Sequence, residues 1–363
     1  MPISTTHPFT ATYSRATDIP AYIWDGLKSN EWYTNTVLPH LNKRRAEENA
    51  RYPARQGEFW ITCCTPGSPS TVDLVLSCTD GPVDKYPIFI ASIHPHARLT
   101  QDFLEERIDI LVEALAKVVS PSRVYSVYAA EPISVKFAQA WAQRTGIQPM
   151  REPYYASKVS YCTKDTLAEP PTRQAQLHPR QGAFECRLAQ DPDLDNLAAL
   201  CFGFAFESPP FIHSRESAYQ EARALLGRRQ AWVLAAHTPN SRSHLASIVA
   251  VTRNTENVAT ITKVYTLPEH RGHGYAETLV RHVTKEYLKT RQVVMLYVGH
   301  DNPAANVYRR VGYVGLGKES VQVKGVDRWM EVGFDQNKVV LGDLFDIKGR
   351  VPASSSYAPP TNA

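Results

Sequence analysis

The stretch from 271 to 276, Arg-Gly-His-Gly-Tyr-Ala, places an arginine and two glycines between an apolar run and a strongly patterned segment. The apolar run stops at Pro268 and the next segment has helical spacing, which predicts a strand-to-helix junction. The first N–H groups of a helix lack intrahelical partners, and the helix dipole adds partial positive charge there. Gly272 and Gly274 would let an anion approach closely, and Arg271 adds a forked cationic donor. The loop therefore indicates a cradle for a pyrophosphate.

Two better-known phosphate loops do not fit this stretch. The NTPase pattern GxxxxGK[ST] is absent, and the dinucleotide pattern GxGxxG is incomplete because only Gly272 and Gly274 are present. A dinucleotide loop would also stand near the start of a βαβ unit, whereas three predicted strands of this half come before the strand that leads into the loop. A glycine-rich turn without a ligand is the alternative that the residues alone leave open.

The segment after the loop carries one apolar stripe, because Ala276, Leu279, Val280, Val283 and Tyr287 recur at helical spacing. Alternating patterns and buried-type runs predict strands around it, two of them joined by a turn-rich hairpin loop at 238–243. The predicted strands cover 184–190, 231–237, 244–255, 258–267, 292–300 and 313–323, and the predicted helices cover 193–206, 215–227 and 303–312. This order predicts an α/β (α+β) domain with at least one parallel crossover.

The first half of the chain repeats this order of elements. Predicted strands at 86–94, 123–130 and 154–162 alternate with predicted helices at 103–119 and 134–146. We interpret the chain as two copies of one fold, one of them diverged, and two merely mixed domains are the alternative. The expected boundaries are 1–165 for the first domain, 166–182 for a linker, 183–348 for the second domain and 349–363 for a disordered tail.

Composition excludes several classes of protein. Of the 363 residues, 43 % are hydrophobic and 21 % charged, which fits a globular protein with two cores. The net charge of +4, without a Lys/Arg block, argues against a nucleic-acid partner and mildly favours an anionic ligand. No apolar run reaches the roughly 18 residues of a membrane span, and no apolar leader opens the chain. Six cysteines without metal-site spacing predict free thiols in a cytoplasmic protein.

The loop at 271–276 resembles the Arg/Gln-x-x-Gly-x-Gly/Ala motif of the GNAT superfamily of N-acetyltransferases. A second stretch, Asn-Pro-Ala-Ala-Asn-Val-Tyr-Arg-Arg-Val-Gly-Tyr at 302–313, is similar to the Asn…Ala…Tyr-x-x-x-Gly-Phe/Tyr segment on the fourth helix of that family. The resemblance covers 184–334. It implies a tandem GNAT-like chain whose domains each have a mixed, mostly antiparallel sheet, a V-shaped splay and flanking helices. The first copy would be degenerate and the second active.

The resemblance also implies acetyl-CoA as the cosubstrate, and no metal. The pyrophosphate would meet the backbone N–H groups of the loop, at Arg271, Gly272, His273, Gly274, Tyr275 and Ala276. The pantetheine arm would pair with the backbone of the splayed strand, at Val264, Tyr265 and Thr266, and Asn302 would add a contact. Tyr308 would protonate the leaving thiolate, a role that suits a hydroxyl with an ordinary pKa of about 10.

Some of these positions have a second interpretation. Tyr308 could be an aromatic residue packed on the sheet, and its spacing from Asn302 is one residue shorter than is common in the family. The splayed strand has no glutamate to act as a general base. Glu269 is expected to face solvent and Asp301 is a candidate by position alone, so we name no base. The cations on the two following helices would be solvated or would meet the 3′-phosphate of coenzyme A; they are Arg281, Lys285, Arg309 and Arg310.

The equivalent junction in the first half has no glycine between Ser92 and Glu106, so we expect no cosubstrate there. The sequence therefore predicts an N-acetyltransferase that acts on a primary amine of a small molecule, by direct attack in a ternary complex. A protein lysine or N-terminal amine is the rival acceptor, and a silent coenzyme A-binding scaffold is the rival class. A monomer and a homodimer are both compatible with the sequence.

Overall fold

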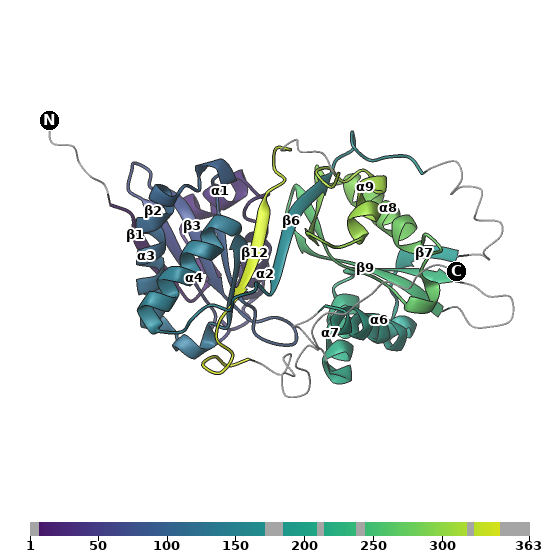
Figure 1. The fold of residues 1–363 in the computed structure, drawn as a ribbon, viewed down its shortest axis with the longest axis horizontal. Helices are drawn as coiled ribbons and strands as arrows, with labels where there is room; N and C mark the ends of the chain where they lie inside the picture. The colour runs from purple at the N-terminus through teal and green to yellow at the C-terminus, as the bar shows by residue number, and fades with distance from the viewer. Residues whose placement is uncertain (1–6, 171–183, 209–213, 237–243, 318–322, 342–363) are drawn as a thin grey trace.

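The computed structural model describes residues 7–170, 184–208, 214–236, 244–317 and 323–341. The expected hairpin loop at 238–243, most of the expected linker at 166–182 and the expected tail at 349–363 lie outside these residues. The described chain forms one sheet of twelve strands in the order β1-β2-β3-β4-β5-β12-β6-β11-β10-β9-β8-β7, which runs across the whole molecule (Figure 1).

Both halves contribute strands and helices in a repeated order. The strands are β1 (Phe9–Tyr13), β2 (Phe59–Thr65), β3 (Thr71–Cys78), β4 (Ile88–Ser92), β5 (Ser126–Ala130), β6 (Tyr155–Cys162), β7 (Phe184–Leu188), β8 (Ala231–Ala236), β9 (His244–Asn254), β10 (Val258–Thr266), β11 (Val293–Gly299) and β12 (Arg328–Gly333). The helices are α1 (Ala21–Ser29), α2 (Leu38–Asn49), α3 (Gln101–Val118), α4 (Glu131–Thr145), α6 (Leu194–Phe206), α7 (Arg215–Gly227), α8 (Tyr275–Leu288) and α9 (Ala304–Val311). The predicted helices therefore all form.

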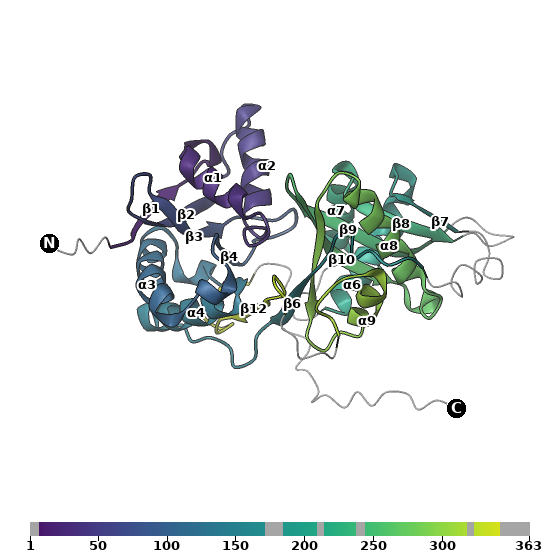
Figure 2. The ribbon, with the colours of Figure 1, turned by 90° about the horizontal axis from the view of Figure 1, so that it is seen from above.

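Helices cover the sheet on both faces. In the second half, α8 and α9 lie on one face and α6 and α7 on the other (Figure 1), and each pair closes its own apolar core. In the first half, α1 and α2 lie opposite α3 and α4 (Figure 2). Among the described strands, only β4–β5 and β10–β11 pair in parallel, which confirms the expected crossovers in a mostly antiparallel sheet.

Each parallel pair separates after a short ladder. Strand β10 pairs with β11 from Val258 to Ile261, and an irregularity in its register with β9 lies between Ile261 and Lys263. Beyond it, β10 stays with β9, while β11 continues against β6 as far as Gly299. The two strands therefore diverge in the V-shaped splay that the resemblance implies. Strands β4 and β5 separate in the same way after Phe89 and Tyr128.

The two halves exchange strands at their junction. Strand β12 comes from the range expected to belong to the second domain, but it lies between β5 and β6 and pairs with both. Strand β6, from the first half, pairs in turn with β11. The sheets of the two halves are therefore continuous, and the first half is completed by the end of the chain.

The last predicted strand, at 313–323, is wrong over its described residues. Residues 313–317 form no strand, and the strand of this part of the chain is β12 instead. Gly312 and Gly315 have φ angles of 114° and 77°, which extended backbone does not allow. Tyr313 lies in the core beneath α8, where its hydroxyl is 2.9 Å from that of Thr284. The apolar pattern of the segment therefore reflects packing in a turn.

Two further observations concern the whole described chain. None of its helices has the length and apolar character needed to cross a membrane. All six cysteines are free, five of them buried and Cys186 half-buried, as expected.

Candidate active site

The glycine loop has the backbone conformation that its residues require. Gly272 and Gly274 have φ angles of 78° and 74°, in the left-handed region that other residues rarely adopt. A Cβ on Gly272 would meet no atom within 4 Å, so the loop faces open space. Helix α8 begins at Tyr275, directly after Gly274, and no side chain caps its first turn.

The backbone N–H groups from 272 to 277 form no hydrogen bond with any described residue. Together with the helix dipole they make an anion site of the kind found at helix starts. Glu277, in the first turn, does not oppose this, because its buried carboxylate is bound by Arg281 at 2.9 Å and by Arg310 at 2.6 Å. Arg281 also donates to the carbonyl oxygen of Ala168. Arg281 is thus neither solvated nor free for a phosphate, whereas Lys285, Arg309 and Arg310 are exposed.

One edge of the splayed end of β10 pairs with no described strand. Leu267 N–H donates to Ala246 on β9, so the backbone groups of its neighbour Thr266, and of Val264, point to the opposite edge. The carbonyl of Thr266 accepts a hydrogen bond from Arg271 Nε at 3.1 Å. This edge is therefore free to pair with an extended ligand, except where Arg271 covers it.

Arg271 forms a bidentate ion pair that the sequence did not indicate. Its Nη2 lies 2.7 and 2.8 Å from the two carboxylate oxygens of Glu207, at the end of α6. Tyr265 joins the pair through its hydroxyl, which donates to Glu207 at 3.3 Å, and burial followed by the charge of Glu207 raises the pKa of Tyr265. A Cβ on Gly203 would come within 2.5 Å of that hydroxyl, so the glycine lets Tyr265 lie against α6.

Tyr308 lies on α9, on the same face of the sheet as the glycine loop helix. It is 8 % exposed and packs with Val298, Leu279 and Tyr313 in the core under α8 and α9. Its hydroxyl forms no hydrogen bond with a described residue. Burial, and after it the neighbouring Tyr155, raises the pKa of Tyr308, so the hydroxyl stays protonated at neutral pH. The packing and the proton-donor interpretations are thus compatible.

The remaining predicted contacts are local. Asn302 lies just before α9, and its Oδ1 accepts from Ala304 N–H at 2.9 Å. His273 is exposed, its Nδ1 lies 2.8 Å from the carbonyl oxygen of Arg271, and its ring stacks on that of Tyr275. Glu269 and Asp301 are exposed, so neither is a buried base. No group of three or more possible metal ligands occurs among the described residues.

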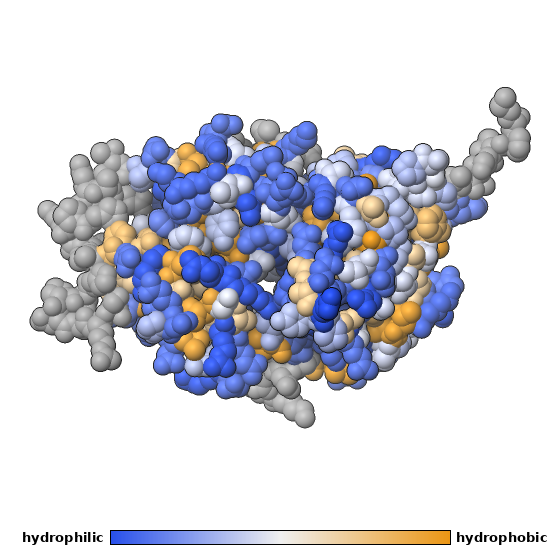
Figure 3. Space-filling view, turned by 180° about the vertical axis from the view of Figure 1, so that it is seen from behind, coloured by the Kyte–Doolittle hydropathy of each residue, from blue (hydrophilic) through white to orange (hydrophobic). Residues whose placement is uncertain are grey.

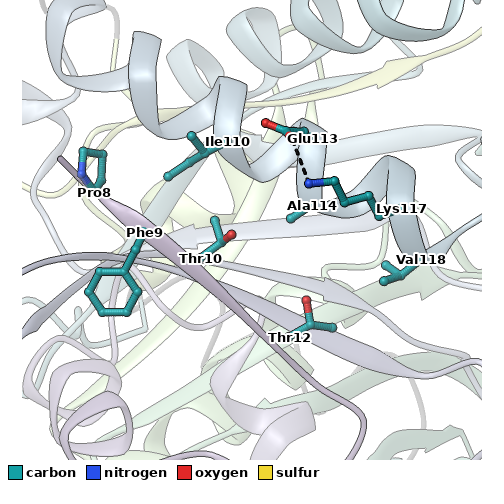
Figure 4. Close-up of a pocket in the computed structure, with 9 residues that line it drawn as sticks. All are labelled: Pro8, Phe9, Thr10, Thr12, Ile110, Glu113, Ala114, Lys117 and Val118. Atoms are coloured by element: carbon teal, nitrogen blue, oxygen red, sulfur yellow. Dashed lines mark hydrogen bonds and ion pairs between the residues drawn. The ribbon is translucent and has the colours of Figure 1, made fainter.

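A separate hollow lies in the first half of the chain. A groove of about 370 Å³ separates the edge strand β1 from α3, with Thr10 and Thr12 on one side and Ile110 and Ala114 on the other (Figure 4). It shares no residue with the loop or with the splay of the second half, so it is not part of the candidate site.

Comparison with known proteins finds a family match in the second half of the chain. Residues 192–313 match the family model described as the acetyltransferase (GNAT) family, and this segment contains the glycine loop, α8 and α9. This third of the chain is therefore similar to the GNAT acetyltransferases. No curated protein matches the sequence.

Solved structures share the fold over most of the chain. A Drosophila protein is similar over 89 % of this chain and 98 % of its own, at 11 % identity and a TM-score of 0.57. A glucosamine N-acetyltransferase region of a fungal multi-domain GH3 β-N-acetylglucosaminidase is similar over 92 % of this chain and 38 % of that chain, at 12 % identity and a TM-score of 0.50. A tandem GNAT protein from the clavulanic acid biosynthesis pathway is similar over 90 % of this chain and 98 % of its own, at 15 % identity and a TM-score of 0.47.

Proposed function

We propose that the chain transfers an acetyl group from acetyl-CoA to a primary amine of a small molecule, by direct attack in a ternary complex. The observation that carries this proposal is the start of α8, where two left-handed glycines present unpaired N–H groups directly after the splayed strand. A pyrophosphate is the anion that suits this start, and the free edge of β10 suits the amides of a pantetheine arm.

Different residues bind different parts of the cosubstrate. The loop from Arg271 to Ala276 holds the pyrophosphate, and Val264 and Thr266 pair with the arm through their edge backbone groups. An N–H on that edge donates to the thioester oxygen, where negative charge develops during attack. The backbone of Tyr265 faces β9, so its part is to hold this strand through its side chain.

The reaction needs a neutral amine and a proton for the leaving sulfur. The nitrogen forms a bond to the thioester carbon, the carbon–sulfur bond breaks, and Tyr308 gives its proton to the thiolate. The proton lost by the nitrogen after attack returns to the phenolate through solvent. A raised pKa keeps Tyr308 protonated until the thiolate forms.

A small acceptor is favoured because the first half stands close to the site. Strand β6 runs beside β11, and Tyr155 donates from it to the carbonyl of Tyr297 at 3.2 Å. Asn35, before α2, accepts from the Thr260 hydroxyl at 2.8 Å, on the strand that leads into the splay. These contacts leave less room for a folded protein than an open second half would.

Two measurements test the proposal on the full chain. Calorimetry with coenzyme A is expected to show one site, lost in Gly274→Asp. An amine panel with acetyl-CoA, followed by free thiol release, is expected to identify an acceptor. Binding without release from any amine would instead favour a silent coenzyme A-binding protein, and absence of binding would contradict the cradle.

A further inference from the structure

Arg253, near the end of β9, has no carboxylate partner among the residues that the structure describes. Its guanidinium carbon lies 5.4 Å from the ring centre of Phe89 and 5.7 Å from that of Tyr297. Phe89 belongs to the first half and Tyr297 to the second, so the side chain is held between the two halves. It is half-buried, and its guanidinium forms no ion pair or hydrogen bond with a described residue. The rings fix its position while its N–H donors remain unused.

The position of Arg253 relates it to the splay. Its register partner is Thr260, one residue before the β10–β11 ladder ends at Ile261 and Leu296. Tyr297 is the first residue of β11 beyond that ladder, and its ring faces Tyr128 and Trp329 on the side away from α8. The guanidinium therefore lies beside the closed end of the splay, on the opposite face of the sheet from Tyr308.

The surroundings of Arg253 are positive. His40, on α2, stacks on Phe89, and burial, followed by the charges of Arg253, Lys43 and other cations, lowers its pKa to about 3. Burial, and then the nearby Arg228, lowers the pKa of Lys43 to about 8. Burial and the neighbouring cations both disfavour a positive charge on these two groups, while Glu47 acts in the other direction on Lys43.

Glu47 lies 3.7 Å from the Lys43 Nζ, and two other carboxylates around these cations have partners elsewhere. Glu221 pairs with Lys263 at 2.7 Å. Glu331 is buried and accepts from the Ser126 hydroxyl at 2.6 Å, and burial raises its pKa to about 7, although the Ser126 bond and Arg253 act in the other direction. Neither carboxylate lies within ion-pairing distance of Arg253.

Buried polar atoms without partners occur at the same place. The Tyr297 hydroxyl and the Asn35 Nδ2 are both buried and meet no hydrogen-bond partner among the described residues. Buried polar atoms are usually satisfied, so such atoms suggest a missing partner. The space-filling view shows the surface hollowed where the two halves meet (Figure 3).

We propose that the acceptor carries an anionic group, a carboxylate or a phosphate, in addition to its amine, and that Arg253 binds this group between the two halves. This rests on the proposed transferase function, which supplies the amine. The anion would take the unused guanidinium donors, and the amine would then reach the closed end of the splay from the α2 side. The first half is thus part of the acceptor site through Phe89 and His40.

Pairs of amines with and without the anion test this proposal. An α-amino acid is compared with its amide, and a hexosamine 6-phosphate with the free hexosamine, as acceptors of the full chain. We expect kcat/KM to favour the anionic member of at least one pair by about tenfold or more, since a hydrogen bond to a charged group is typically worth that much. Which pair responds distinguishes a carboxylate from a phosphate.

Substitutions then assign the preference. Arg253→Met keeps the apolar stem and removes the charge. The ratio of kcat/KM between the anionic and the neutral amine should therefore fall to within about threefold of one, which is the uncertainty of such comparisons. Arg253→Lys should keep part of it. Arg223→Met, an exposed arginine on α7, is the matched control and should keep all of it. A preference for the neutral amines, or one that survives in Arg253→Met, overturns the proposal.

A binding measurement separates this inference from the proposed function. Inorganic phosphate and acetate are titrated by calorimetry into the chain saturated with coenzyme A, or into the unliganded chain if coenzyme A does not bind. Binding of either anion that is lost in Arg253→Met and kept in Arg223→Met supports the anion site even if no amine is acetylated. No binding to the parent chain, or equal binding to Arg253→Met, overturns it. Melting curves check that each variant folds.

Discussion

The two strand-to-helix junctions of the molecule, from Ser92 to Gln101 and from Thr266 to Tyr275, connect equivalent elements and differ in chemistry. In the first, the Thr100 hydroxyl accepts from Phe103 N–H and caps α3. In the second, Gly274 precedes α8, and the first N–H groups of this helix bond to no described residue. Backbone groups that a side chain already satisfies are not available to a ligand. The same topology can thus hold a site or close it, depending on the cap.

An arginine lies beside each junction, and its burial differs. Arg107 binds Asp73 at 2.8 Å with side chains 16 % and 4 % exposed. Arg271 binds Glu207 with side chains 46 % and 42 % exposed. A buried pair is costly to break, whereas an exposed pair exchanges readily with another anion.

The splay of the first half is also filled. A cavity of about 10 Å³ remains there, lined by Trp329 and Asp327 beside Ile133 and Leu99. That volume holds about one water molecule. Because Trp329 lies on β12, this late strand of the chain closes the splay of the first half, whereas β10 and β11 of the second half pair only as far as Ile261 and Leu296.

The largest effect is expected from a substitution that blocks the anion site at the second junction. Gly274→Asp forces a side chain into the left-handed region and puts a negative charge where the pyrophosphate would lie. We expect coenzyme A binding to fall at least about 100-fold, since strain and repulsion each cost on the order of 1–3 kcal/mol. Calorimetry measures the loss, and Ala97→Asp at the first junction is the control that should bind normally. Equal loss in both variants would contradict the distinction.

Removal of one hydroxyl tests the catalytic side of the second half. Tyr308→Phe keeps the ring, so turnover should fall about 100-fold while the affinity for coenzyme A is retained, within the usual range for a general acid. Tyr313→Phe removes a buried hydroxyl bonded to Thr284 and should lose about 1 kcal/mol of stability with normal turnover. Steady-state kinetics and melting curves on both variants decide. Turnover of Tyr308→Phe within about threefold of the parent would mean that solvent, and not Tyr308, protonates the thiolate.

The first junction is expected to matter for stability alone. Burial acts to raise the pKa of Asp73, but hydrogen bonds from His94, Thr65 and Arg107 hold it below its usual value. A lowered folded pKa contributes stability above the unfolded value of about 3.9, and this is lost as pH falls through the folded pKa. Asp73→Asn should therefore cost about 2 kcal/mol at pH 7, the scale of hydrogen bonds to a charged group.

Urea unfolding at pH 7 and near pH 3 measures this difference, which should shrink in acid. Glu113→Gln, which removes an exposed ion pair with Lys117, should change stability little at either pH. Coenzyme A binding should be unchanged in both variants. Weaker binding in Asp73→Asn would mean that the first junction also serves the cosubstrate.

The sequence predicted those helices and turns whose signals lie within a few neighbouring residues. Helix α8 could be predicted from its apolar stripe, and the turn before it from the glycines at 272 and 274. Both signals depend only on residues a few positions apart in the sequence, and not on a distant segment of the chain. Strand β12 was missed because its partners lie in the other half of the chain, and the glycines at 312 and 315 turned an apolar segment away from a strand. Glu207 and Arg253 carried no signal, since both depend on contacts between distant segments.

The smallest expected effect concerns the exchange of Arg271 between two anions. In the described chain it is bound to Glu207 and to the carbonyl of Thr266, at the edge that the pantetheine arm would use. If the pyrophosphate displaces the carboxylate, the cost of breaking that pair weakens binding. An exposed pair is worth about 0.2–1 kcal/mol, so Glu207→Gln should tighten coenzyme A binding by up to about fivefold.

The direction of this change is what makes the measurement informative. If Glu207 instead holds Arg271 in place for the phosphate, the same substitution weakens binding. Glu286→Gln, which removes an exposed pair with Lys289 on α8, controls for the change in net charge and should bind as the parent does. Raising the salt concentration should reduce the gain, because exposed charges are screened within a Debye length of about 10 Å at 0.1 M. Tighter coenzyme A binding that decreases with salt would establish that Arg271, at the second junction, can exchange Glu207 for another anion. At the first junction Arg107 stays bound to the buried Asp73.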